Sequence, residues 1–144
     1  MTTIERSALV AFSAQEMFDL VSDVERYPEF MPGCVKTDLI GRGDDWLEAK
    51  LHLGRGRLNT SFTTHNVVDA PNRMELSLTE GPFKSFHGVW TFTELAERAC
   101  KLELKLEFEF SNKLIAMAAG RLFESMANQQ VDAICQRARQ IYAE

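Results

Sequence analysis

The clearest hydrophobic pattern in the chain is the strict alternation over Leu102–Phe110, where even-numbered residues are apolar and odd-numbered residues are charged. A strand with this pattern buries one face of a sheet and exposes the other to water. Ser111 and Asn112 then supply N-cap chemistry, and Lys113–Tyr142 contains no proline and a single glycine. The sequence therefore predicts a final strand that runs directly into one long helix.

The rest of the chain predicts short elements separated by turn signals. Loose alternation predicts a first strand over residues 2–12, and a capping box from Ser13 to Glu16 opens a short helix, followed by a second short turn that ends at Tyr27. Glycine- and proline-containing turns then separate the later strands. The expected order is one strand, two short helices, six antiparallel strands and one long helix, which is an α+β fold.

The start of the predicted long helix carries small side chains, reading Leu114–Gly120. Small residues leave room between a helix and a sheet, and an apolar cavity between them suits an apolar ligand. The alternative is a solid core without a cavity, and the sequence alone does not decide between the two.

Composition limits the classes of function. The chain has 144 residues, which suits a single domain over 1–144, and a net charge of −5 argues against a general binder of polyanions such as DNA. Three cysteines without a CxxC pair indicate neither a disulfide framework nor a metal site. The N-terminus lacks the pattern of a signal peptide, and no stretch is apolar and long enough to span a bilayer. A cytoplasmic protein is expected.

Three segments carry motifs of a known family. They are Tyr27–Cys34, Gly81–Phe92 and Phe108–Leu114, the last continued by Gly120–Phe123, Val131 and Arg137-Ala138. Together they resemble the START-like family of coenzyme Q-binding and polyketide cyclase-type proteins, and within it the bacterial branch that includes the ribosome-association toxins. One departure is Gln130, where the family usually has a methionine.

The resemblance implies a helix-grip fold, in which a curved antiparallel sheet of about seven strands wraps a long C-terminal helix around a hydrophobic tunnel. It implies binding of ubiquinone or another isoprenoid lipid in support of respiration, with no other cofactor. For the bacterial branch it also implies binding to the large ribosomal subunit. A transient contact with a membrane surface, at the periphery of the inner membrane, is a further expectation.

Residues on the expected cavity side are the candidate ligand contacts. Two lie in a loop, six on strands and three on the long helix: Phe30, Met31, Leu51, Phe62, Met74, Leu76, Trp90, Leu104, Met117, Ala118 and Leu122. Pro28 and Pro32 flank the loop residues, and they either stiffen the mouth of a tunnel or only end a helix and begin a strand.

Catalytic chemistry is not favoured by the pattern. By strand parity His52, His65 and His87 point away from the cavity, where a general base would have to lie. Cys34 has only Lys36 nearby to lower its pKa, so it is interpreted as a packed hydrophobe. We therefore expect a non-enzymatic lipid-binding protein. A ribosome-binding module and a polyketide cyclase or dehydratase remain the alternatives.

Cationic residues near turns are the candidates for phosphate contact, because guanidinium groups bind phosphate bidentately. Arg42, Arg55 and Arg57 occupy glycine-flanked turns, and Lys113 and Arg121 lie on the long helix. These residues are expected to meet ribosomal RNA or lipid headgroups. The three turn arginines are expected either to form one basic rim or to be solvated turn residues.

Overall fold

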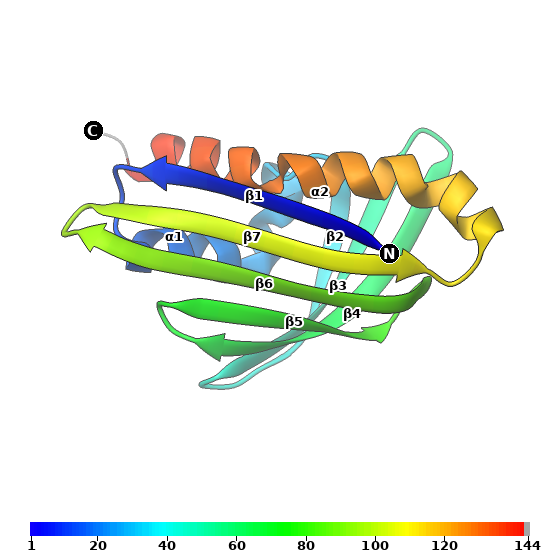
Figure 1. Cartoon of the computed structure of the whole chain (residues 1–144), viewed down its shortest axis with the longest axis horizontal. Helices are drawn as coiled ribbons and strands as arrows, with labels where there is room; N and C mark the ends of the chain where they lie inside the picture. Colours follow the sequence, from blue (N-terminus) through cyan, green and yellow to red (C-terminus); the bar gives the residue numbers. More distant parts are fainter. Residues whose placement is uncertain (143–144) are drawn as a thin grey trace.

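The computed structural model describes residues 1–142. Along the chain the elements are β1 (Thr2–Val10), α1 (Ala14–Ser22), the 3-10 helix η1 (Val24–Glu29), β2 (Cys34–Arg42), β3 (Trp46–Arg55), β4 (Leu58–Asp69), β5 (Arg73–Glu80), β6 (Phe83–Ala96), β7 (Ala99–Phe110) and α2 (Lys113–Tyr142). The seven strands form one antiparallel sheet in the order β1-β7-β6-β5-β4-β3-β2 (Figure 1). The predicted α+β order is confirmed, including the final strand that runs into the long helix.

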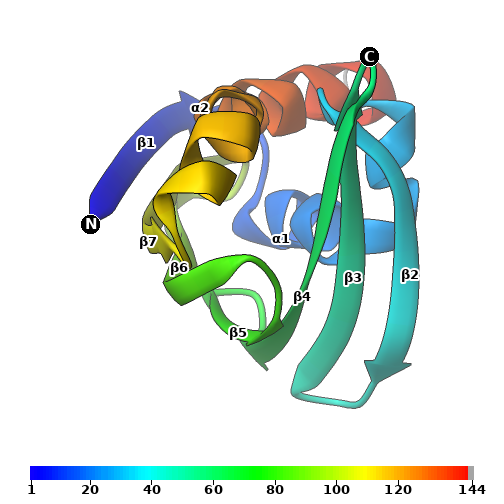
Figure 2. The same ribbon diagram turned by 90° about the vertical axis from the view of Figure 1, so that its right-hand side faces the viewer.

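The sheet is strongly curved. Figure 2 shows β2, β3 and β4 on one side and β1, β7 and β6 on the other, with α2 lying across the open side between them. Register shifts interrupt the pairing of β2 with β3, of β4 with β5 and of β6 with β7. Such bulges increase local twist and bend a sheet, so they help to produce the concave face that receives α2.

The helix ends use the predicted caps. Ser13 Oγ accepts a hydrogen bond from the Glu16 amide at 3.1 Å, and the Ser13 amide donates to Glu16 Oε1 at 3.0 Å. At the start of α2 the Asn112 side chain accepts a bond from the Ile115 amide at 2.9 Å. These bonds each satisfy one free amide in the first turn of α1 and of α2.

The core between sheet and helix is dominated by aromatic rings. Phe123 of α2 lies at its centre, with ring centroids 4.7 to 6.1 Å away on Phe62, Phe83, Phe86, Phe108 and Phe110. The even-numbered residues Leu102, Leu104, Leu106 and Phe108 of β7 are buried beneath the helix, as the alternation predicts. This packing fixes the middle of α2 against the sheet.

The first turns of α2 extend beyond the sheet (Figure 1). Leu114 and Met117 are 77% and 81% exposed, Ala118 is also exposed, and the first buried residue of the helix is Ala119. The expectation that Met117 and Ala118 face a cavity is therefore wrong. The 30-residue helix is long enough to leave its first turns without a strand beneath them, so these small side chains meet water instead of a cavity.

Candidate functional site

A small internal cavity lies between the sheet and α2. Its volume is about 30 Å³, which is room for about one water molecule. It is lined by residues from η1, five strands and α2: Val24, Tyr27, Ala49, Leu51, Phe62, Thr64, Asn66, Met74, Leu76, Phe86, Trp90, Leu106, Phe123, Met126 and Gln130. The sequence predicts a cavity beneath the small residues at the start of α2, but the observed space lies beneath the middle of the helix, at Phe123, Met126 and Gln130, and side chains fill most of it.

Five of the predicted ligand contacts line this cavity, namely Leu51, Phe62, Met74, Leu76 and Trp90. All five come from strands, where strict alternation assigns a side chain to one face of the sheet. Strand alternation therefore brings five of the six strand candidates to the cavity wall, whereas none of the loop or helix candidates reaches it.

The remaining predicted contacts lie elsewhere. Met31, Leu104 and Leu122 are buried in the core but do not line the cavity. Phe30 is half-buried, and its ring lies 5.1 Å from the guanidinium carbon of Arg137. A cationic group over an aromatic face is a stabilising contact, so Phe30 helps to hold the loop on α2.

Buried polar residues in the lining were missed as site residues. Thr64, Asn66 and Gln130 are buried within the otherwise apolar wall. The alternation that places Phe62 inward also places Thr64 and Asn66 inward, so strand parity was the signal available for them.

The three histidines lie outside the cavity, as predicted, and each faces a carboxylate. His52 Nε2 is 2.8 Å from Asp38, His65 Nδ1 is 3.2 Å from Glu48 and His87 Nε2 is 3.6 Å from Glu75. The hydrogen bond from His52 is the main cause that lowers the pKa of Asp38. Each pair joins two neighbouring strands on the outer face of the sheet. None of these residues lines the internal cavity.

The cavity contains little that titrates. Among the described lining residues Tyr27 is the sole titratable side chain, and its hydroxyl donates to the Val21 carbonyl. Burial raises the pKa of Tyr27 well above its ordinary value. The thiol of Cys34 lies outside the lining, and burial raises its pKa to about 11, so it is a packed thiol and a poor nucleophile.

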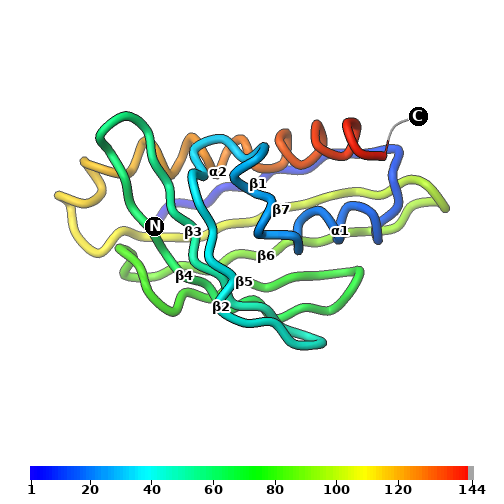
Figure 3. The backbone as a smooth tube through the Cα atoms, turned by 180° about the vertical axis from the view of Figure 1, so that it is seen from behind, coloured from blue at the N-terminus to red at the C-terminus, as the bar shows by residue number. Residues whose placement is uncertain are grey.

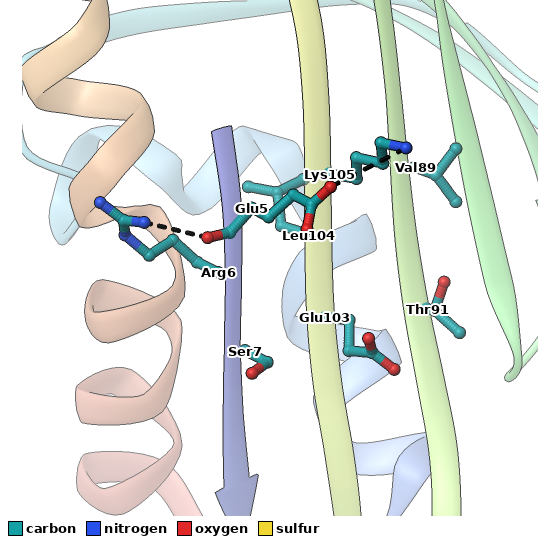
Figure 4. A pocket seen from close by; sticks show the side chains of 8 residues that line it. All are labelled: Glu5, Arg6, Ser7, Val89, Thr91, Glu103, Leu104 and Lys105. Atoms are coloured by element: carbon teal, nitrogen blue, oxygen red, sulfur yellow. Dashed lines mark hydrogen bonds and ion pairs between the residues drawn. The ribbon is translucent and has the colours of Figure 1, made fainter. Parts of the chain in front are cut away.

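A larger depression of about 480 Å³ lies on the outer face of β1, β7 and β6 (Figure 4). Two of its cationic side chains are held by contacts within the protein: Lys105 Nζ is 3.9 Å from the Glu5 carboxylate, and Arg6 donates to the Glu5 main-chain carbonyl at 2.9 Å. Arg6 also donates to Asn128 and so joins β1 to α2. The depression is open and polar, which is a poor match for an apolar ligand.

The candidate cations do not form one rim. Adjacent turns of a meander lie at opposite ends of the strand they share, so Arg42 at the end of β2 is remote from Arg55 and Arg57 at the β3–β4 turn. Arg42 donates to the Ser22 carbonyl at 2.7 Å. The prediction that Arg42, Arg55 and Arg57 form one basic rim is therefore wrong for Arg42.

The other candidate cations lie on two separate segments at one end of the molecule (Figures 1 and 2). Figures 1 and 3 show the β3–β4 turn, with Arg55 and Arg57, at the same end as the start of α2. Lys113 and Arg121 are exposed on that part of α2. We call Arg55, Arg57, Lys113 and Arg121 the basic end.

With the geometry established, comparison with known proteins identifies the family. Residues 10–135 match the sequence profile described as polyketide cyclase / dehydrase and lipid transport. The chain belongs to this family. Relatives of it include the ribosome association toxin RatA of Vibrio cholerae, which is 44% identical over 144 residues and is matched over the whole length of both chains.

A more distant family relative is the mitochondrial coenzyme Q-binding protein COQ10 of Drosophila melanogaster. It is 28% identical over 138 residues, which are 93% of this chain and 57% of that protein. Both relatives fit the bacterial branch and the quinone-binding group that the sequence motifs indicate.

Solved structures confirm the START-like, helix-grip fold of the family. Zhui aromatase/cyclase from a Streptomyces species has a TM-score of 0.81 at 18% identity, covering 99% of this chain and 96% of its own. A START superfamily protein from Mycobacterium smegmatis has a TM-score of 0.79 at 19% identity, covering 96% and 98%. At these identities the likeness extends to the fold and not to the chemistry. No helix within residues 1–142 is long and apolar enough to cross a membrane.

Proposed function

We propose that this protein binds an isoprenoid quinone or a closely related lipid between its sheet and α2, and that it does so without catalysis. The observation that carries the proposal is the internal cavity, whose lining is apolar apart from three buried polar residues and the Tyr27 hydroxyl. The family profile includes lipid transport, and the Drosophila relative is named as a coenzyme Q-binding protein.

The apolar lining supplies the binding energy in this proposal. Removing apolar surface from water contributes about 25 cal/mol per Å², and this gain needs no directional contact with the ligand chain. Aromatic residues Phe62, Phe86, Trp90 and Phe123 occur on both the sheet and helix walls. Their flat faces suit the ring of a quinone as well as an isoprenoid chain.

The size of the cavity requires movement on binding. A volume of about 30 Å³ is far below the roughly 300 Å³ or more of a typical small-molecule site. Lining side chains must therefore rearrange when the ligand enters. Met74 and Met126 are suited to this, because unbranched thioether side chains adapt to irregular spaces.

A cyclase or dehydratase reaction is disfavoured by the same lining. A general acid or base must lie within hydrogen-bond reach of the proton that it moves. Tyr27 is the one titratable group in the described lining, and its hydroxyl is already committed to the Val21 carbonyl. The role proposed for the site is therefore binding.

Native mass spectrometry of protein purified from a quinone-producing host tests this proposal. We expect a bound species whose mass matches the quinone of the host and which is released on unfolding. Protein that is free of lipid, and that takes up no added quinone from detergent, would contradict it.

A second function, association with the large ribosomal subunit, is favoured by a separate observation. The Vibrio cholerae relative named for ribosome association is matched over its whole length at 44% identity. The basic end offers exposed guanidinium groups at Arg55, Arg57 and Arg121 for contact with RNA phosphates. Because the net charge is −5, such contact has to be local.

The basic end also fits the expected transient contact with a membrane. Leu114 and Met117 are highly exposed beside Lys113 on the first turns of α2. Apolar side chains flanked by cations are typical of segments that rest on anionic lipid surfaces. Exchange of a lipid with a membrane would take place at this end.

A further inference from the structure

A buried amide in the cavity wall has no satisfactory hydrogen-bond environment. Asn66 lies on the inward face of β4 and is 4% exposed. Its Nδ2 donates to the sulfur of Met74 at 3.6 Å, which is a weak acceptor. Its Oδ1 is buried without a hydrogen-bond partner among the described residues. Asn66 therefore presents an unused acceptor in an otherwise apolar wall.

Such an arrangement is costly for the fold itself. A buried polar atom without a partner loses its hydrogen bonds to water and gains nothing in return. A leucine has a similar shape and would fill the same position beside Met74 without that cost. The amide is thus better explained by a bound partner than by the stability of the empty protein.

The surroundings of Asn66 restrict what the partner is. Phe86, Trp90 and Phe123 line the same cavity, and their faces favour a flat ring. Gln130 faces the cavity from α2, while Asn66 faces it from β4. Side-chain amides from two elements therefore line a space that is bordered by aromatic rings.

We propose that Asn66 Oδ1 accepts a hydrogen bond from a ring hydroxyl of the bound ligand, so that the site prefers a hydroquinone or phenol to the corresponding quinone. This inference rests on the proposed function and names the chemical form of its ligand. A quinone carries carbonyl oxygens, which accept hydrogen bonds, whereas a quinol carries hydroxyl groups, which donate them.

Rotating the Asn66 side-chain amide by 180°, which exchanges Oδ1 and Nδ2, does not give the quinone an equally good set of hydrogen bonds. In that orientation Nδ2 would donate to a ring carbonyl, but Oδ1 would face the Met74 sulfur, which has no hydrogen to donate. One buried polar atom of Asn66 would stay unsatisfied. The orientation that satisfies both atoms is the one in which the ligand is the donor.

The test measures binding of a short-chain ubiquinol and of its oxidised quinone to the full chain under anaerobic conditions. Wild-type protein should bind the quinol about tenfold more tightly than the quinone. This ratio is expected because the quinol forms one buried hydrogen bond with Asn66 Oδ1, whereas the quinone leaves that acceptor unsatisfied. Asn66→Leu should remove that preference by weakening quinol binding alone, and should raise the Tm of the ligand-free protein.

Ser85→Ala is the matched control, because Ser85 Oγ is also buried and unpaired but lies outside the cavity lining. It should leave the affinities for both forms unchanged. Equal affinity of wild-type protein for both forms would overturn the inference, and so would a preference for the quinol that survives in Asn66→Leu. Either result would leave the proposal of lipid binding intact, and Asn66 would then hold only a water molecule. Failure of wild-type protein to bind either form would refute the proposed function as well.

Discussion

Arg137 of α2 and Glu29 of η1 form an ion pair, with Nη2 of Arg137 2.8 Å from Oε1 of Glu29. The same guanidinium lies over the ring of Phe30. These two contacts attach the segment after α1 to the second half of α2. The 3-10 helix η1, which contributes Val24 and Tyr27 to the cavity lining, is therefore fixed to the helix that covers the cavity.

The ion pair predicts a pH dependence of stability. Hydrogen bonds from Arg137 and then Arg26 hold the pKa of Glu29 below its ordinary value of 4.5. Because the folded pKa is the lower one, the pair stabilises the fold above pH 4.5 and loses this effect as the pH falls through the folded pKa. In thermal unfolding, Glu29→Gln should have a lower Tm than wild type at neutral pH and an equal Tm in acid.

Glu25→Gln is a suitable control for that experiment. Glu25 is exposed on the same 3-10 helix and has no ion pair among residues 1–142. Its removal should have little effect at any pH. A Tm difference for Glu29→Gln that stays constant into acid would show that the ion pair is not its cause.

Removing the ring of Phe123 should destabilise the fold strongly, because this ring packs against five other phenylalanines at the centre of the core. Phe123→Ala should lower the free energy of unfolding by about 3–5 kcal/mol, as expected for a large cavity in a packed core. Leu114→Ala on the exposed start of α2 should change it by less than about 0.5 kcal/mol. Urea unfolding measures both, and similar values for the two variants would contradict the packing.

The cysteines should be almost inert in the folded protein. Burial raises the pKa of Cys34 and of Cys100 to about 11, and it also raises the pKa of Cys135. At pH 8 about one thiol in a thousand would be ionised at such a pKa, and the thiolate is the reactive form. Ellman's reagent should react with the native protein far more slowly than with protein in urea. Rapid native labelling of any of the three would be inconsistent with their burial.

Strand parity accounts for most of what the sequence predicted correctly. It placed Leu51, Phe62, Met74, Leu76 and Trp90 on the concave face, because alternation in a strand fixes the direction of each side chain. The capping box of α1 was equally readable, since it depends on residues three positions apart. Such local features do not require knowledge of how the elements pack.

Errors arose where packing between distant elements decides the outcome. Met117 and Ala118 have the composition of a buried helix face, but the sequence does not say where the sheet beneath α2 ends. The importance of Asn66 depends on which atoms surround it, and its neighbour Met74 lies on another strand. Arg42 lies far from Arg55 and Arg57 because successive turns of a meander alternate between the two ends of its strands, which the composition of the turns does not reveal.

If the protein binds the large ribosomal subunit through the basic end, substitutions there should weaken that binding. Replacing Arg55 and Arg57 by glutamate should reduce co-sedimentation with purified large subunits and leave quinone binding unchanged. Binding of the wild type should weaken as salt rises, because phosphate contacts release counterions. Arg42→Glu at the opposite end is the control and should sediment like wild type. Wild-type protein that does not co-sediment even at low salt would remove the ribosome proposal alone.

Filling the cavity tests the central claim most directly. Ala49 is fully buried in the lining, and Ala49→Leu places additional side-chain atoms in the space that the ligand would occupy. Ala118→Trp adds a larger side chain on the exposed start of α2, outside the lining. The measurement is the amount of quinone bound per folded protein after incubation with excess quinone, with folding checked by circular dichroism. We predict that Ala49→Leu binds much less quinone than wild type and that Ala118→Trp binds the same amount. Equal binding by wild type and Ala49→Leu, or loss of binding in Ala118→Trp alone, would contradict a site between the sheet and α2.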